Sequence, residues 1–138
     1  MSHSHCKIWV HVVIGVKYRD PVINFNNEFI IHKIIKREVK KTGCSLIAIN
    51  GTNDHVHLLI KLHPVQSISA VMKQIKGASS RMISRLSLCK NEFYWQVGYG
   101  AFSVSDKDIK GTIHYIRQQK VHHRKFSYTQ ELKRLNKC

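Results

Sequence analysis

The fold is decided by one short stretch of the sequence, Asn50–Leu62, which reads NGTNDHVHLLIKL. Asn-Gly is a strong turn signal, so a strand expected over residues 46–50 should reverse here and return as its antiparallel partner. Successive side chains of a strand point to opposite faces. One face of the returning strand carries Val56, Leu58, Ile60 and Leu62, and the other carries His55, His57, Leu59 and Lys61. The stretch therefore predicts a β-hairpin with one core face and one face that presents two histidines.

The rest of the chain supplies further elements around this hairpin. Alternating apolar residues predict strands, and apolar residues at helical spacing, bounded by capping residues, predict helices. The expected elements are a strand over 7–16, a helix from Asn26 or Asn27 to Gly43, strands over 46–50 and 55–62, a helix from Ser67, an extended segment over 93–104, and a helix from Ser105 to about Lys120. The order β-α-β-β-α-β is the split βαβ pattern. We therefore expect an α+β, ferredoxin-like fold with an antiparallel sheet, helices on one face, and an additional C-terminal helix.

The composition indicates a small folded protein that binds a polyanion. The 138 residues suffice for a single domain over residues 1–138, with about 126–138 as an arm or tail. Lys and Arg number 23 against 8 Asp and Glu, a formal charge of +15, while 43% hydrophobic residues exclude a disordered basic tail. No apolar run is long enough to span a bilayer and no secretory signal is visible. The four scattered cysteines suggest reduced thiols, so we expect a cytoplasmic protein.

The histidine pair and the third helix carry the candidate chemistry. Two histidines on one strand face stand roughly 6.5 to 7 Å apart at Cα, close enough to chelate one metal ion. With ten histidines in the chain, however, an isolated H-x-H also arises readily by chance. On the third helix, Tyr115 and Gln119 share a face, with His122 one turn further on, apart from the isoleucine stripe. The alternative for Tyr115 is a half-buried boundary residue. Asp54 is expected to point away from His55 and to serve the turn.

A basic face on the second helix is the candidate nucleic-acid surface. Between residues 61 and 90 there are six basic residues and no acidic one. The candidate contacts are Lys73, Lys76, Ser80, Arg81 and Arg85, and the alternative is a solvated helix face. A second function class also fits the charge, namely a non-catalytic, RRM-type nucleic-acid-binding module. The segment Gly98-Tyr99-Gly100 favours it weakly, because its flanking residues are out of register with the RNP1 pattern.

Five segments in one order resemble a known family, the single-tyrosine transposases of the insertion-sequence 200/605 group. The resemblance extends from about Lys7 to His123. It rests on Lys17-Tyr18-Arg19, on His55-Val56-His57 within Asn53–Leu59, on Lys76–Arg81, on Trp95–Ser105 (WQVGYGAFSVS), and on Tyr115 with Gln119 four residues later. Members of this group are called HUH enzymes because two histidines flank a bulky apolar residue, and Val56 fills that position here.

The resemblance implies a function as well as a fold. Such enzymes act as homodimers that cut and rejoin single-stranded DNA at hairpin-forming, imperfectly palindromic ends of a mobile element. Tyr115 would be the nucleophile, forming a 5′-phosphotyrosine intermediate, and His55, His57 and Gln119 would hold a divalent ion, Mg²⁺ or Mn²⁺. Imidazole alone would favour softer ions, so the choice of metal rests on the resemblance. In the family the tyrosine helix can also pack against the partner's histidines, and the sequence leaves that question open.

The chemistry gives each of these residues a task. A phenol with a pKa near 10 is only about one part in a thousand ionised at neutral pH, so Tyr115 needs activation before it can attack phosphorus. A metal ion with open coordination positions neutralises charge on the phosphate and aligns the scissile bond. Exchange of one phosphodiester for another needs no ATP, which agrees with the absence of a P-loop from the sequence.

Overall fold

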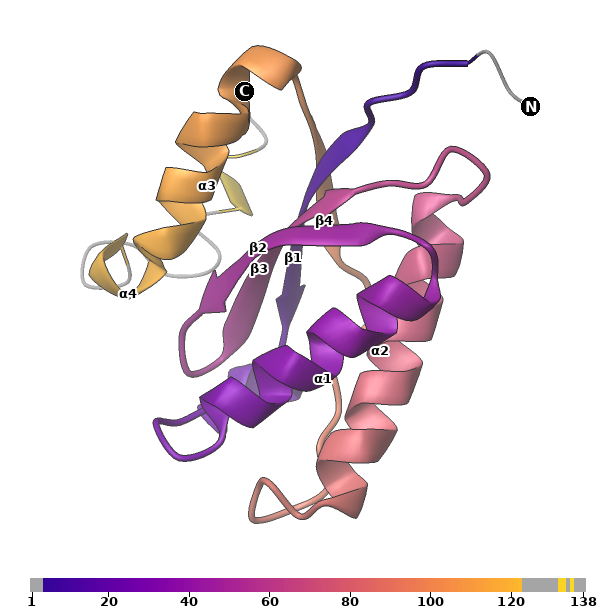
Figure 1. Cartoon of the computed structure of the whole chain (residues 1–138). Helices are drawn as coiled ribbons and strands as arrows, with labels where there is room; N and C mark the ends of the chain where they lie inside the picture. The colour runs from indigo at the N-terminus through magenta and orange to yellow at the C-terminus, as the bar shows by residue number, and fades with distance from the viewer. Residues whose placement is uncertain (1–3, 123–131, 134, 136–138) are drawn as a thin grey trace.

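A four-stranded antiparallel sheet forms the centre of the molecule (Figure 1). The computed structural model describes residues 4–122, 132, 133 and 135. The strands are β1 (Trp9–Gly15), β2 (Ser45–Gly51), β3 (His55–Lys61) and β4 (Gly100–Val104), in the spatial order β2-β3-β1-β4. This order, with helices between the first and second and between the third and fourth strands, confirms the predicted ferredoxin-like α+β fold. Most of the predicted arm over 126–138 lies outside the described residues.

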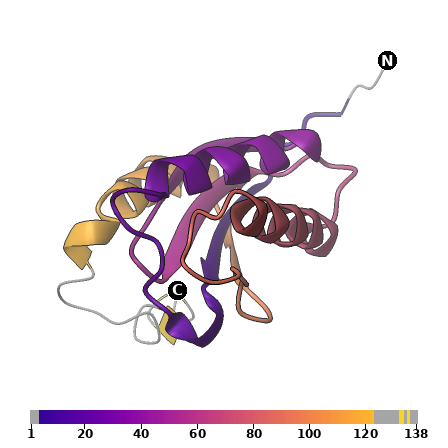
Figure 2. The same ribbon diagram turned by 90° about the horizontal axis from the view of Figure 1, so that it is seen from below.

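The helices α1 (Glu28–Lys41) and α2 (Ile68–Arg85) cover one face of the sheet (Figure 2). Alternate strand residues fill the space beneath them, as the period of two requires. The sheet contributes Val10, Val12, Ile14, Val56, Leu58 and Ile60, and the helices contribute Ile31, Ile35, Val71, Met72 and Ile75. Each of these side chains gains about 1.5 to 3 kcal/mol by leaving water. This layer is the hydrophobic core that fixes the register of the strands.

Local signals explain where the two core helices begin and end. Ser67 Oγ accepts a hydrogen bond from the Ala70 amide, which is the expected N-cap of α2. Gly43 follows the end of α1 with a positive φ of 84°, as a left-handed C-terminal residue should. Asn27 precedes α1, but its amide donates to the carbonyls of Val22 and Leu88 instead of capping the helix. It therefore joins the entry of α1 to the loop after α2.

The hairpin turn falls later than the sequence predicts. Strand β2 runs through Gly51, and residues 52–54 make the turn. Gly51 is opposite Val56, and a Cβ atom added there would lie 2.8 Å from Val56 Cα and still closer to the His55 carbonyl. A glycine is needed here because the strands approach closely, and not because the chain reverses at this residue.

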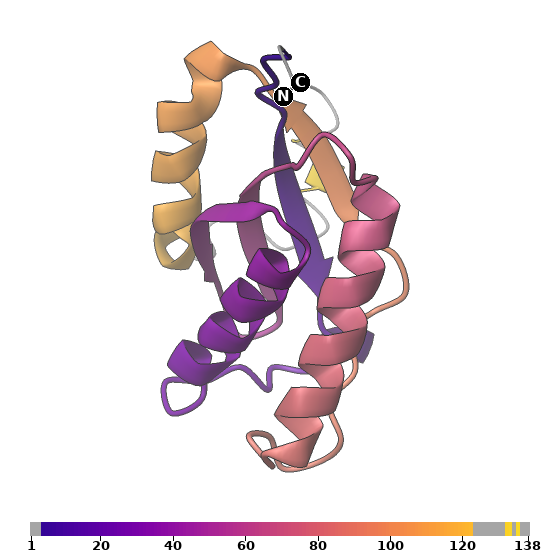
Figure 3. The same cartoon turned by 45° about the vertical axis from the view of Figure 1, so that its right-hand side comes forward.

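The opposite face of the sheet is covered by a third helical segment (Figure 3). Helix α3 (Ile109–Arg117) follows a short 3-10 turn, η2 (Asp106–Asp108), and packs against β2 and β3. Ser105 Oγ donates to Asp108 Oδ2 at 2.7 Å, so the predicted S-x-x-D signal shapes this entry. The helix is not continuous to Lys120, because it breaks at Gln118 and resumes as the short α4 (Gln119–His122). The sheet therefore separates α3 from α1 and α2.

The segment that leads into β4 is only partly regular. Of the predicted extended region over 93–104, Gly100–Val104 forms the strand beside β1, and Trp95 makes a single bridge to Val16. The Trp95 indole is buried and donates to Ser79 Oγ at 2.8 Å, so this ring belongs to the core. None of the helices in the described part of the chain is both long and apolar enough to cross a membrane.

Candidate active site

His55 and His57 lie side by side on the face of β3 that α3 covers. His57 is paired with Val13 and His55 with Gly15 of the neighbouring strand β1, and both side chains are fully buried. Their ring centroids are 5.2 Å apart. The alternation read from the sequence thus places both imidazoles on the predicted face, away from the hydrophobic core.

Each of these imidazoles is held through its Nδ1 atom. His55 Nδ1 lies 2.8 Å from Asp54 Oδ1 and 3.2 Å from Thr52 Oγ1. His57 Nδ1 lies 2.8 Å from Nε2 of His11 on β1. A histidine that binds metal through one nitrogen ordinarily has its other nitrogen held in this way. A metal ion would accordingly be bound by Nε2 of both rings.

The expectation for Asp54 is wrong. Its carboxylate does not turn away from His55 but forms a hydrogen bond with it. The strict alternation of a strand does not apply to Asp54, because it belongs to the turn that precedes β3. A turn residue can direct its side chain along the strand instead of across the sheet, and here that arrangement orients the first imidazole.

Helix α3 brings Tyr115 onto the histidines of the same chain. The Tyr115 ring meets the His57 ring edge-on, with 5.7 Å between centroids and 77° between planes. Gln119 is fully buried, and its amide donates to the Tyr115 carbonyl at 3.4 Å. The structure therefore brings Tyr115 onto the His55–His57 pair and buries Gln119 one turn further along from Tyr115, whereas the side chain of His122 lies outside the described residues.

The end of this helix is fastened to the hairpin that carries the histidines. Asn50 Nδ2 donates to the Arg117 carbonyl at 3.1 Å, which satisfies a carbonyl at the C-terminus of α3. Lys120 Nζ donates to Asn50 Oδ1 at 2.9 Å and to Glu28 Oε1 at 2.8 Å. These contacts fix the position of the tyrosine helix over its own β2–β3 hairpin.

His11 is a member of this cluster that the sequence did not predict. This side chain is 3% exposed, bonds to His57, and packs edge-on against Tyr115 with 5.9 Å between ring centroids. The signal was present, because alternation in β1 places Trp9, His11 and Val13 on the face opposite Val10 and Val12. Recognising it requires the knowledge that β1 and β3 are neighbours.

The donors present fit a divalent metal ion with open coordination positions. Across residues 4–122, and the few described beyond them, no three or more His, Cys, Asp or Glu side chains are spaced to hold a metal. The resemblance implies Gln119 as the third donor, and its amide is buried on the turn that follows Tyr115. Two neutral imidazoles and an amide would leave the ion its full charge, which suits a phosphate ligand.

Helix α2, which carries the basic residues, lies on the other side of the sheet from α3 (Figure 3), whereas the histidines face α3. Lys73, Arg81 and Arg85 are exposed, whereas Ser80 Oγ donates to the Gly77 carbonyl at 3.1 Å. Lys76 Nζ donates to the carbonyls of Gln96 and Gly98, both at 2.7 Å, and burial lowers the pKa of this ammonium group. The predicted DNA-binding set thus divides into exposed cations and residues bonded within the fold.

This division predicts different effects for two lysines on one helix. Lys76→Met should lower the free energy of unfolding by about 1 to 2 kcal/mol, because the segment before β4 loses both charge-assisted hydrogen bonds. Lys73→Met, the matched control, should leave stability unchanged. Urea denaturation of the two variants measures this difference, and equal stabilities would contradict the role assigned to Lys76.

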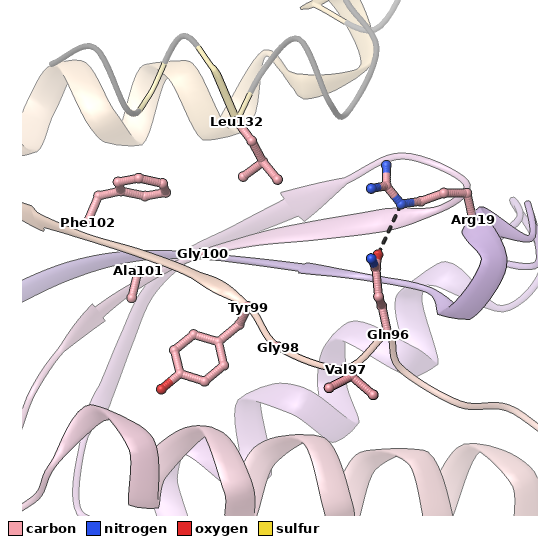
Figure 4. Close-up of a pocket in the computed structure, with 9 residues that line it drawn as sticks. All are labelled: Arg19, Gln96, Val97, Gly98, Tyr99, Gly100, Ala101, Phe102 and Leu132. Atoms are coloured by element: carbon pink, nitrogen blue, oxygen red, sulfur yellow. Dashed lines mark hydrogen bonds between the residues drawn. The ribbon is translucent and has the colours of Figure 1, made fainter.

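A pocket of about 430 Å³ lies along β4 (Figure 4), next to the histidine cluster that His11, His55 and His57 form. Its lining residues are Arg19, Gln96, Val97, Gly98, Tyr99, Gly100, Ala101, Phe102 and Leu132. Phe102 belongs both to this lining and to the cluster, since its ring lies 6.3 Å from that of His11. Arg19 Nε donates to Gln96 Oε1 at 3.1 Å, so a guanidinium group stands at the pocket. Two segments far apart in sequence, Lys17–Arg19 and the stretch before β4, meet here.

Most of the chain matches a known protein family. A family model described as "Transposase IS200 like" matches residues 4–119. The protein is therefore a transposase, a DNA-processing enzyme. It belongs to the IS200-like transposase family, as the resemblance in the sequence implied.

Individual relatives agree with this assignment. The chain is 29% identical over 114 residues to the ISDra2 transposase TnpA of Deinococcus radiodurans, covering 79% of this chain and 81% of that one. It is 23% identical over 115 residues to the transposase for insertion sequence element IS200 of Salmonella typhimurium, covering 80% and 76%.

Solved structures share the fold. The crystal structure of a Deinococcus radiodurans protein assigned as a transposase superposes with a TM-score of 0.70 and 27% identity, over 86% of this chain and 95% of that one. A REP-associated tyrosine transposase bound to a REP hairpin gives a TM-score of 0.66 at 16% identity, over 89% and 74%.

Proposed function

We propose that this transposase cleaves and rejoins single-stranded DNA at the ends of a mobile element by transesterification, with Tyr115 as the nucleophile. One observation carries the proposal: the Tyr115 ring lies edge-on against His57, whose ring is in turn 5.2 Å from that of His55. The buried Gln119 follows Tyr115 by one turn and bonds to its carbonyl. Binding DNA alone does not require a phenol to be packed against two oriented imidazoles, with a buried amide on the next turn. These groups are the parts needed for metal-assisted attack on a phosphodiester.

The residues divide the reaction between them. His55, His57 and Gln119 would hold the divalent ion, Mg²⁺ or Mn²⁺, which when bound neutralises charge on the scissile phosphate. The Tyr115 hydroxyl gives its proton to water and its oxygen attacks phosphorus. The bond between phosphorus and the 3′ oxygen breaks, and that oxygen takes a proton from water and leaves as a 3′-hydroxyl. The 5′-phosphate stays on Tyr115. Attack by another 3′-hydroxyl on this linkage restores the phenol and joins the new strand, without ATP.

The substrate proposed for this chain is single-stranded DNA with hairpin ends. The pocket that Arg19 lines lies beside the histidine cluster, and its guanidinium group would attract the DNA strand toward Tyr115. The exposed cations on α2, Lys73, Arg81 and Arg85, are proposed to bind the flanking hairpin. Because α2 and α3 lie on opposite faces of the sheet, the DNA must then pass round the edge of the sheet (Figure 3). We place the reaction in the cytoplasm, because a transposase acts on chromosomal DNA.

The RRM-type alternative is less well supported. An RRM binds RNA on an open face of its sheet. In this protein α3 packs on the face opposite α1 and α2, and Tyr99 precedes β4 instead of lying within a central strand. Tight RNA binding without DNA cleavage in any metal would favour that alternative.

Incubation with an element end tests the proposed function. Purified protein with Mn²⁺ or Mg²⁺ should cut a labelled single-stranded oligonucleotide that contains the end and its imperfect palindrome. Part of the label should then migrate with the protein in denaturing gel electrophoresis. Binding without cleavage, under each metal and with both ends of the element, would contradict the proposal.

The placement of Tyr115 also predicts that it acts on histidines of its own chain within the proposed homodimer. The contacts of Asn50 with Arg117 and Lys120 hold the tyrosine helix in this position. Mixed dimers of Tyr115→Phe and His57→Ala should then stay inactive, because each site lacks one part. Cleavage by the refolded mixture, with neither variant active alone, would show that the tyrosine acts on the partner's site.

A further inference from the structure

His11 lies in the middle of the central strand β1, where a buried polar side chain is unusual. Its strand β1 is otherwise apolar around it, with Leu59 opposite on β3 and Phe102 opposite on β4. The imidazole is 3% exposed, and its Nε2 is 2.8 Å from Nδ1 of His57. Burying an imidazole costs free energy of folding unless the ring is hydrogen-bonded. The partner of the His11 ring is His57, a proposed metal ligand.

We propose that His11 is a positioning residue that fixes both the orientation and the tautomer of His57; the inference rests on the proposed metal site. A neutral imidazole carries one N–H. When Nε2 of His57 binds a metal, its proton must be on Nδ1, which then donates to His11 Nε2. The opposite arrangement would place a proton on the coordinating nitrogen and exclude the metal. We infer that His11 carries its own proton on Nδ1, so that its Nε2 accepts from His57 and favours the metal-binding form of that ligand.

The two proposed ligands are thus oriented by chemically different groups. The carboxylate of Asp54 holds His55, whereas the imidazole of His11 holds His57. His11 also packs against Tyr115, with ring centroids 5.9 Å apart and planes at 73°. One side chain therefore contacts both a proposed ligand and the proposed nucleophile, and it sets their relative position from within the sheet.

Two substitutions separate positioning from simple packing. His11→Phe fills the same space but offers no acceptor, whereas His11→Gln places an amide oxygen near the former Nε2. Mn²⁺ dissociation constants are measured by titration calorimetry and by electron paramagnetic resonance, with folding checked by circular dichroism. We expect His11→Phe to weaken Mn²⁺ binding by about 10- to 100-fold and His11→Gln to recover most of that loss. Unchanged affinity in His11→Phe, or an equal loss in both variants, would overturn the proposal.

Two further measurements keep the inference distinct from the proposed function. If the wild type binds no Mn²⁺, or His57→Ala binds it as the wild type does, the metal site itself is wrong and the inference falls with it. The tautomer can also be read in the unaltered protein, before any metal is added, from ¹⁵N shifts and long-range couplings. A proton on Nδ1 of His57 supports the role of His11, and a proton on Nε2 overturns it even if no variant folds.

Discussion

Tyr115→Phe is expected to abolish covalent attachment of DNA and to lower strand cleavage by about 10⁴-fold or more, the size of effect seen when a nucleophile is removed. The substitution keeps the aromatic ring and hence its edge-on contacts with His57 and His11. Only the hydroxyl group is lost, so the fold and the affinity for single-stranded DNA should be retained. Single-turnover cleavage of a labelled element end measures the rate, and gel shift in the same buffer measures binding.

Tyr94→Phe is the matched control for this experiment. Tyr94 is half exposed and donates to Glu92 at 2.7 Å, away from the histidine cluster. Removing this hydroxyl group should leave the rate of DNA cleavage unchanged. If Tyr115→Phe cleaved at the wild-type rate, another group would have to be the nucleophile.

The second large effect concerns the metal. Chelation with EDTA should stop cleavage, and added Mn²⁺ should restore it in the wild type. His57→Ala should not be rescued by Mn²⁺ at the same concentration, and its Mn²⁺ affinity should fall by more than the roughly 10- to 100-fold expected when only an outer partner is lost. The physical reason is that His57 would supply one of the two imidazoles in the proposed ligand set, and the Gln119 amide is a weaker donor than an imidazole.

His114→Ala provides the control for this loss. His114 is exposed on α3 beside Tyr115 in sequence, so it tests whether removal of any nearby histidine has the same effect. We expect normal Mn²⁺ affinity and normal cleavage. Full cleavage by the chelated wild type would contradict the metal assignment altogether.

Much of the fold could be predicted because it depends on local signals. Alternation in β1 and β3 gives the core face directly, Ser67 caps α2, and Gly43 ends α1. The place of the hairpin turn was predicted less well. The dipeptide Asn50-Gly51 is typical of a turn, but here it ends the strand β2. The reason for the glycine is the close approach of the Val56 backbone to Gly51, which the sequence does not show.

The candidate site was predictable where it follows from one element, and not where it depends on contacts between elements. His55 and His57 share a face by strand geometry, and Tyr115 and Gln119 by helix geometry. The approach of His11 to His57 depends on which strands are neighbours, a long-range property. The bonds of Lys76 depend likewise on a loop twenty residues away, so a lysine on a basic helix face was interpreted as a phosphate contact.

The most direct measurement is the chemical identity of the protein–DNA bond. The trapped adduct is digested with nuclease and protease, and the modified peptide is sequenced by mass spectrometry. We expect a single nucleotide attached through its 5′-phosphate to the side chain of Tyr115. A nucleotide on any other residue, or cleavage that releases both strands with no protein attached, would contradict it.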